Sequence, residues 1–175
     1  MAAPRPQTLK VSLPTLAKMI DHSLLHPTMT DDIVAEGLKI SAKYSVATAC
    51  IKPYHIPFAK KALEGTSVLV CPVIGFPHGN STTEVKVFEA RRAAEEGGKE
   101  IDMVVNIGRV LSGKWEFVEN EIRKVNEAVV GAGAILKVIF ENDCETVLFS
   151  HLYSPSCTPF SRTFPSRARF GKPGY

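Results

Sequence analysis

The strongest constraint on the fold is a regular alternation between Thr15 and Asp143 of short apolar runs with longer amphipathic stretches. Short apolar runs bounded by turn residues are typical of buried strands, and apolar residues at helical spacing are typical of helices that pack on a sheet. The alternation therefore predicts an α/β domain with five strands and helices between them. Strands connected in this way form a parallel sheet with right-handed crossovers.

The predicted elements follow directly from this pattern. The five strands are expected in the apolar runs 20–25, 46–51, 67–76, 100–106 and 134–141. Helices are expected over 31–42, 53–63, 81–96 and 118–129. Thr30 is a typical N-cap for the first helix, and Ser81 with Glu84 fits the capping-box pattern for the third. Pro72 lies inside the third strand, which is unusual for a central strand.

Two architectures fit five such units: an open, flavodoxin-like sheet, or the first five βα units of a (βα)8 TIM barrel. Strand alternation places Asp102 on the side opposite Ile101 and Met103, and Lys137 on the side opposite Leu136. Burial of a carboxylate and a lysine within apolar strands costs free energy unless the two form an ion pair or serve a function. They predict either a structural ion pair or an active-site pair inside a barrel. In the second case, desolvation is expected to lower the pKa of Lys137 for amine chemistry.

Three further residues are candidates for the same interior. Asp21, in the first strand, either points into it or caps a turn. Cys50, in the second strand, fits core packing better than a nucleophile, because no histidine is placed to activate it. His78 follows the third strand in a loop with two glycines, and in a barrel this loop lies at the catalytic face. The histidines and cysteines have no metal-ligand spacing, so no metal site is predicted.

Charge and hydropathy limit the kinds of molecule that this chain is expected to bind. The net charge of +3 comes entirely from residues 144–175, and the remainder of the chain is neutral. A neutral body without a basic stripe argues against nucleic acid as a partner. No apolar run approaches the roughly 20 residues of a membrane span, and the N-terminus has no apolar signal region. With two cysteines inside apolar strands, these features predict a cytoplasmic protein with reduced thiols.

Five segments together resemble deoxyribose-phosphate aldolase in their order and spacing. They are IDHSLL (20–25), ATACIKP (47–53), VIGFPHG (73–79), EARRAAEEGGKEIDMVVNIG (89–108) and LKVIFEN (136–142). The resemblance covers nearly all of residues 14–143. It implies a (βα)8 barrel lyase of deoxyribose phosphate catabolism that needs neither a metal nor a cofactor. Such an aldolase reversibly cleaves 2-deoxy-D-ribose 5-phosphate to D-glyceraldehyde 3-phosphate and acetaldehyde through a Schiff base.

The resemblance also implies roles for individual residues. Asp102 matches the aspartate that relays protons between water, substrate and enzyme. Lys137 matches a lysine that supports the active centre and is not the nucleophile. Asp21 and Cys50 match residues that line the pocket for the phosphorylated sugar substrate. In the family, the Schiff-base lysine lies on the sixth strand in a Lys-Thr-Ser-Thr-Gly-Phe motif, and nothing in residues 144–175 matches it.

Three segments are therefore predicted: an N-terminal extension (1–13), a partial aldolase barrel (14–143) and an irregular C-terminal tail (144–175) rich in proline and serine. One hypothesis is an aldolase by descent whose activity is lost or severely reduced in this form. The alternative is a non-catalytic, truncated product that misfolds or associates with a full-length relative. The unpaired edges of the first and fifth strands favour association, including a homo-oligomer.

Overall fold

The sheet is parallel throughout, and its strands follow one another in the order of the sequence. The computed structural model describes residues 10–141 and 169–170. Its strands are β1 (Asp21–Leu24), β2 (Thr48–Ile51), β3 (Leu69–Ile74), β4 (Glu100–Val104), β5 (Ile135–Ile139) and β6 (Arg169–Phe170). A flavodoxin-like sheet has the order 2-1-3-4-5. The order β1-β2-β3-β4-β5-β6 therefore excludes that alternative and confirms the predicted partial (βα)8 barrel.

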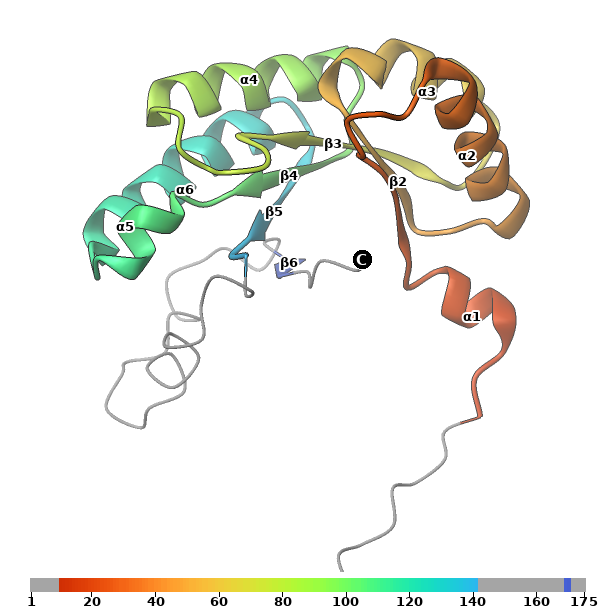
Figure 1. Cartoon of the computed structure of the whole chain (residues 1–175), viewed down its shortest axis with the longest axis horizontal. Coiled ribbons are helices and arrows are strands. Elements are labelled where there is room, and N and C mark those ends of the chain that lie inside the picture. Colours follow the sequence, from red (N-terminus) through yellow and green to blue (C-terminus); the bar gives the residue numbers. More distant parts are fainter. Residues whose placement is uncertain (1–9, 142–168, 171–175) are drawn as a thin grey trace, which may run out of the picture.

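Four helices lie on one face of the curved sheet, α2, α3, α4 and α6 (Figure 1). The helical elements are α1 (Leu13–Ala17), α2 (Asp31–Tyr44), the 3-10 turn η1 (Pro53–His55), α3 (Ile56–Ala62), α4 (Thr83–Glu96), α5 (Ile107–Leu111) and α6 (Trp115–Gly131). The short helices α1 and α5 were not expected from the sequence. Within the described residues, no helix is long and apolar enough to span a membrane.

The N-caps were predicted with mixed success. Thr30 caps α2 as expected, with its hydroxyl accepting a hydrogen bond from the backbone N–H of Ile33. The capping box predicted at Ser81 is wrong by one residue. Thr82 is the N-cap of α4 and accepts from the backbone N–H of Val85. Glu84 is then the second helical residue, and the reciprocal bond of a capping box needs the third.

Pro72 is tolerated inside β3 because the sheet is incomplete there. β3 pairs with β2 along its first half, where Pro72 lies opposite Ile51. Its paired residues with β4 begin only at Val73, opposite Asp102. A proline has no N–H group to donate to a strand ladder, so each proline in a strand can cost a hydrogen bond. Pro72 precedes the residues that pair with β4, and this position avoids most of that cost.

The loop after β3 contains a glycine that no other residue could replace without a shift of the backbone. Gly79 has a φ of +63°, and a Cβ at this position would collide with the backbone oxygen of Val105. Its N–H donates to the Gly75 oxygen at 2.7 Å. These contacts are those of a tight turn, which requires glycine at this position.

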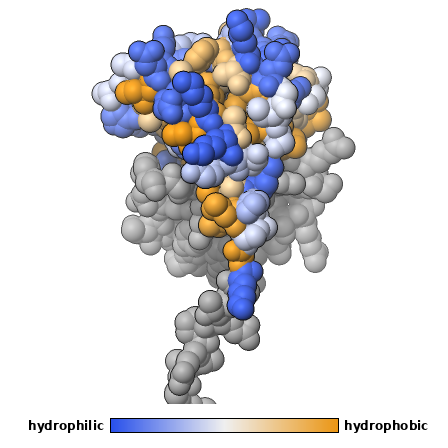
Figure 2. Space-filling view, turned by 90° about the vertical axis from the view of Figure 1, so that its right-hand side faces the viewer, coloured by the Kyte–Doolittle hydropathy of each residue, from blue (hydrophilic) through white to orange (hydrophobic). Residues whose placement is uncertain are grey.

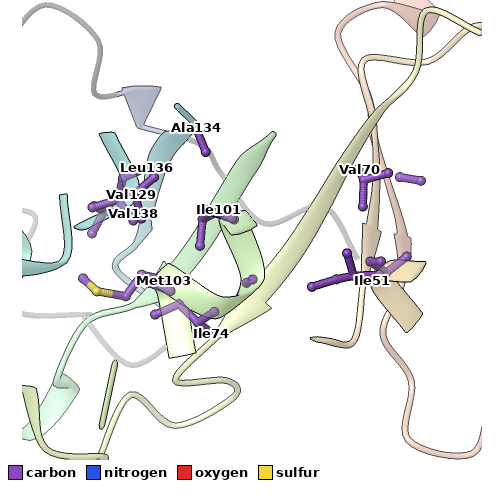
Figure 3. Packing of buried hydrophobic residues seen from close by; sticks show 14 of the residues in the cluster. Ile51, Val70, Ile74, Ile101, Met103, Val129, Ala134, Leu136 and Val138 are labelled. Carbon is purple, nitrogen blue, oxygen red and sulfur yellow. The ribbon is translucent and has the colours of Figure 1, made fainter. Parts of the chain in front are cut away.

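The main core lies between the sheet and its helices, and the predicted strand alternation is confirmed. Every second strand residue enters this core, and Figure 3 shows part of the packing. The buried strand residues on this side are Leu24, Ala49, Ile51, Val70, Ile74, Ile101, Met103, Leu136 and Val138. The alternate residues point to the concave face of the sheet, where Cys50, Cys71 and Val73 form a second, small cluster. His22 of β1 lies on the helix side, where its Nδ1 is 2.8 Å from the Ser41 hydroxyl of α2. The other polar residues of β1 to β5 lie on the concave face.

A fully buried ion pair connects two helices to the end of β4. Lys86 of α4 donates to Glu121 of α6 at 3.0 Å, and both side chains are inaccessible to solvent. The same ammonium donates to the backbone oxygen of Val104 at 2.9 Å. Glu121 also accepts from the backbone N–H of Asn106 at 3.2 Å. Burial lowers the pKa of Lys86, and the bond to Glu121 opposes that change.

We expect the substitution Lys86→Met to reduce the free energy of unfolding by about 3–5 kcal/mol, because it leaves the Glu121 carboxylate buried without its cation. The double variant Lys86→Met with Glu121→Met should lose less, since no buried charge remains. Urea denaturation measures both. The exposed pair Arg123–Glu127 is the control, and Arg123→Ala should cost at most about 1 kcal/mol. A double variant at least as unstable as Lys86→Met would contradict this account.

The predicted irregular tail, residues 144–175, lies outside the described residues except at β6. Here the structure differs from the prediction, because β6 pairs in parallel with β5 and Arg169 lies opposite Lys137. The outer edge of β5 offers hydrogen-bonding groups to such a segment. No proline interrupts the sequence between Pro165 and Pro173, which allows a short strand at this point. The three predicted segment boundaries stay a prediction.

The N-terminal segment leaves apolar side chains in contact with solvent. Leu13, Leu16, Met19 and Ile20 are all exposed. Figure 2 views the molecule from the side of this segment and shows hydrophobic residues at the surface among hydrophilic ones. β1, which follows this segment, is paired on one side by β2, and no strand among the described residues pairs with its other side. This edge of the sheet is therefore open in the described part of the chain.

Candidate active site

The ammonium group of Lys137 lies among three carboxylates on the concave face. Its Nζ is 2.6 Å from Oδ2 of Asp21, 3.2 Å from Oδ1 of Asp102 and 3.3 Å from Oε2 of Glu100. The Lys137 side chain is only 7% exposed, whereas that of Asp21 is 39% exposed. The cluster thus has a buried cation at its centre and reaches solvent through Asp21.

Strand register explains why these side chains meet. Asp102 and Lys137 are direct partners in the β4–β5 ladder. Glu100 is two residues before Asp102 and so points to the same face. Asp21 is held from the other side, because the Thr48 hydroxyl donates to its Oδ1 at 2.7 Å.

The contact between Asp21 and Lys137 also requires the sheet to curve. β1 and β5 are four strand-to-strand steps apart, which corresponds to about 19 Å in a flat sheet at about 4.8 Å a step. Aspartate and lysine side chains together cannot span that distance. The 2.6 Å ion pair therefore exists only because the sheet is rolled as in a barrel.

Two thiols lie next to this charged cluster. Cys50 and Cys71 are paired residues of β2 and β3, and both are buried, free cysteines. The Cys50 thiol donates to Oδ2 of Asp102 at 3.6 Å. Asp102 is thus contacted by a thiol through one oxygen and by an ammonium through the other.

The prediction that desolvation lowers the pKa of Lys137 is wrong. Burial alone does lower this pKa, but the negative groups around the ammonium outweigh it and raise the pKa above its ordinary value. The groups responsible are Cys71, which contributes only when its thiol is ionised, and the carboxylates of Asp102 and Asp21. A hydrogen bond with Cys50 and burial raise the pKa of the Cys71 thiol, so this thiol is uncharged at neutral pH. The carboxylates therefore keep Lys137 protonated.

A simple salt bridge lowers the pKa of an aspartate, whereas the pKa of Asp102 is raised. Burial raises the pKa of its carboxyl group, and the attraction of Lys137 lowers that pKa only in part. A carboxyl group with a raised pKa takes up a proton more readily near neutral pH. The pair thus combines a permanent cation with a carboxyl group suited to accept and return protons.

Comparisons with known proteins identify the family of this chain. No family model matches the chain. It is 41% identical over 152 residues to a deoxyribose-phosphate aldolase of Metamycoplasma hominis, covering 85% of this chain and 69% of that protein. The chain belongs to the deoxyribose-phosphate aldolase family, a family of lyases. A relative from Rhodopirellula baltica is 48% identical over 127 residues, which are 73% of this chain and 53% of that protein.

Solved structures show the same relationship for the fold. A tetrameric deoxyribose phosphate aldolase from Aeropyrum pernix is 32% identical, with a TM-score of 0.68, covering 75% of this chain and 55% of that chain. The aldolase QR15 is 34% identical, with a TM-score of 0.64, over 70% of this chain and 53% of that chain. The chain thus spans about half the length of several family members that it matches.

The structure brings together four of the five candidates from the sequence, Asp21, Cys50, Asp102 and Lys137. His78 is exposed on the loop after β3 and is not one of the residues that contact Lys137. Sequence reasoning missed Glu100, although its position two residues before Asp102 was a usable signal. It also treated Cys71 as core only, because the pairing of β2 with β3 decides its neighbours.

We expect the raised pKa of Lys137 to be visible in the pH dependence of its labelling by an amine-reactive reagent. Only the neutral amine reacts, so the midpoint should lie above the ordinary lysine value of about 10.4. Asp102→Asn removes one negative neighbour and should move the midpoint to lower pH. Peptide mass analysis measures the labelling at each pH.

The exposed Lys43 of α2 is the internal reference, and its labelling curve should not move in the variant. Burial slows labelling of Lys137 without moving the midpoint, so the midpoint is the quantity to compare. A midpoint below the ordinary lysine value would mean that desolvation dominates after all.

Proposed function

We propose that the chain supplies the first part of a deoxyribose-phosphate aldolase site, which reversibly cleaves 2-deoxy-D-ribose 5-phosphate to D-glyceraldehyde 3-phosphate and acetaldehyde through a Schiff base. The observation that carries the proposal is the buried Lys137 ammonium between Asp21 and Asp102 on the concave face. Family membership supports it, since these residues occupy the positions that the sequence resemblance assigned to the site. The activity belongs to deoxyribose phosphate catabolism.

In this proposal the residues divide the work by their charge. Asp102, with its raised pKa, relays protons between water, substrate and enzyme. Lys137 stays protonated and holds Asp102 in place through the 3.2 Å contact. Asp21 and Cys50 line the pocket for the phosphorylated sugar, with Asp21 at its solvent-exposed side. No metal or cofactor takes part in these steps.

Lys137 is a poor candidate for the imine-forming lysine itself. A nucleophilic amine must be neutral, and the carboxylates around Lys137 keep it charged. The sequence contains no Lys-Thr-Ser-Thr-Gly-Phe motif. We therefore propose that catalysis needs an imine-forming lysine that these 175 residues do not supply.

The proposal is tested with a chimera of residues 1–141 and the C-terminal part of the Rhodopirellula baltica relative, whose N-terminal part matches this chain at 48% identity. We expect the chimera to release acetaldehyde from 2-deoxyribose 5-phosphate, measured with alcohol dehydrogenase and NADH. The 175-residue chain alone should show no turnover. In the chimera, Asp102→Asn should lower kcat about 10²–10⁴-fold, because a proton-transfer group is lost.

Lys124→Leu is the matched control, since Lys124 is exposed on α6 and should leave activity unchanged. Borohydride reduction in the presence of substrate, followed by peptide mass analysis, identifies the imine-forming residue. A folded but inactive chimera would contradict the proposed function. A borohydride adduct on Lys137 in the isolated chain would contradict the proposed division of roles.

A second candidate is a non-catalytic chain that associates with itself or with a full-length relative. The open edge of β1 and the exposed apolar residues Leu13 and Leu16 favour it. The tetrameric Aeropyrum pernix structure supports a homo-oligomer as the form of association.

The buried free thiols Cys50 and Cys71 and the neutral body of the chain support a cytoplasmic protein that does not bind nucleic acid.

We expect the purified chain to form oligomers whose mass falls when Leu13→Glu and Leu16→Glu are introduced together, because charges on this segment oppose its burial. Multi-angle light scattering measures the mass at several concentrations. The control is Ile40→Glu, an exposed apolar position on α2 away from this segment. A stable monomer that unfolds reversibly and cooperatively would overturn this second candidate.

A further inference from the structure

Two thiols and one carboxyl group converge on the concave face in a way that the proposed aldolase roles do not use. Sγ of Cys50, Sγ of Cys71 and a carboxylate oxygen of Asp102 all lie within 4.8 Å of one another, and all three residues are buried. Cys50 and Asp102 are already 3.6 Å apart at their polar atoms. Three potential metal ligands from three adjacent strands thus face a common point.

The charge around this point favours a cation. Three carboxylates, those of Asp21, Glu100 and Asp102, share the single ammonium of Lys137. Oδ1 of Asp102 is buried and has no hydrogen-bond partner among the described residues, although it contacts the ammonium at 3.2 Å. Buried carboxylates in excess over their cations are costly. A bound cation would reduce that cost.

The ligand types select the class of cation. Two thiolates with one carboxylate suit zinc and its heavier relative cadmium, whereas magnesium and calcium prefer all-oxygen sites. Tetrahedral zinc with Zn–S bonds of about 2.3 Å places two sulfur atoms about 3.8 Å apart. The three ligand atoms lie within 4.8 Å of one another, so a closure of at most about 1 Å brings them to this spacing. We propose that Cys50, Cys71 and Asp102 bind one thiophilic divalent cation of the class of Zn²⁺ and Cd²⁺.

Binding exchanges protons for the metal without any redox change. The two S–H bonds break, two metal–sulfur bonds form, and two protons pass to solvent. Asp102 then coordinates the cation and is no longer free to exchange protons beside Lys137. If the proposed aldolase function holds, the cation is an inhibitor of that site. No sequence pattern indicates this site, because the ligands lie on three separate strands and show no ligand spacing.

Cadmium tests the site directly, because Cd–thiolate bonds give an ultraviolet charge-transfer band. The experiment uses the full chain with Cys144→Ser and Cys157→Ser, so that Cys50 and Cys71 are the only thiols left. We expect a charge-transfer band that saturates at one Cd²⁺ per chain and weakens when the chain is unfolded in urea. Absence of the band in the folded chain would overturn the proposal.

Variants then identify the ligands in the same background. Cys50→Ser and Cys71→Ser, each alone, should remove most of the band, and Asp102→Asn should weaken Cd²⁺ binding at least about tenfold. Ser23→Ala is the matched control, since Ser23 is an exposed residue of β1 opposite Cys50 in the ladder and is not a ligand. Circular dichroism checks that each variant is folded. Unchanged affinity in Asp102→Asn would overturn the assignment of the carboxylate.

Inhibition is measured separately in the aldolase chimera. Zn²⁺ should inhibit turnover there, and Cys71→Ser should relieve the inhibition. Zn²⁺ that binds without inhibiting would overturn the proposed block of Asp102. The absorption experiment does not depend on turnover, so failure of the aldolase proposal and failure of the metal site give different results.

Discussion

The ion pair between Asp21 and Lys137 is the interaction on which the described structure depends most. It joins the first strand of the sheet to the fifth across the concave face, at 2.6 Å. No flat sheet could make this contact, because the two strands would lie about 19 Å apart. The pair therefore forms because the sheet is curved as in a barrel, and it in turn stabilises that curvature. The same ammonium also contacts Glu100 and Asp102 of β4.

This arrangement explains why the candidate site is electrostatically unusual. A lysine alone in an apolar interior loses its proton easily, and a carboxyl group alone gains one. Here Lys137 keeps its proton because it has several negative neighbours. For Asp102, burial raises the pKa by more than the single close cation lowers it. The two members of one pair thus respond differently to the same burial. Asp102 therefore binds a proton more readily than an ordinary aspartate, whereas Lys137 releases one less readily than an ordinary lysine.

The sequence predicted the parts of this structure that depend on local periodicity. Alternation of apolar residues placed Asp102 and Lys137 on the face opposite Ile101 and Leu136, and the structure confirms it. It could not predict the contact of Lys137 with Asp21, nor the pairing of Cys50 with Cys71. Both depend on strand register and on the curvature of the whole sheet. The sign of the Lys137 pKa shift was missed for the same reason, since it depends on neighbours from other strands.

The Lys86–Glu121 pair has a consequence for how this family can evolve. On their helices the two residues look like ordinary charged surface positions, yet both are completely buried. Loss of either one alone costs about 3–5 kcal/mol, which is a large part of the roughly 5–15 kcal/mol that a domain usually has. A lineage can therefore replace them only together, or by way of a strongly destabilised intermediate. Among related chains, positions 86 and 121 should covary, and a neutral residue at one should be accompanied by a neutral residue at the other.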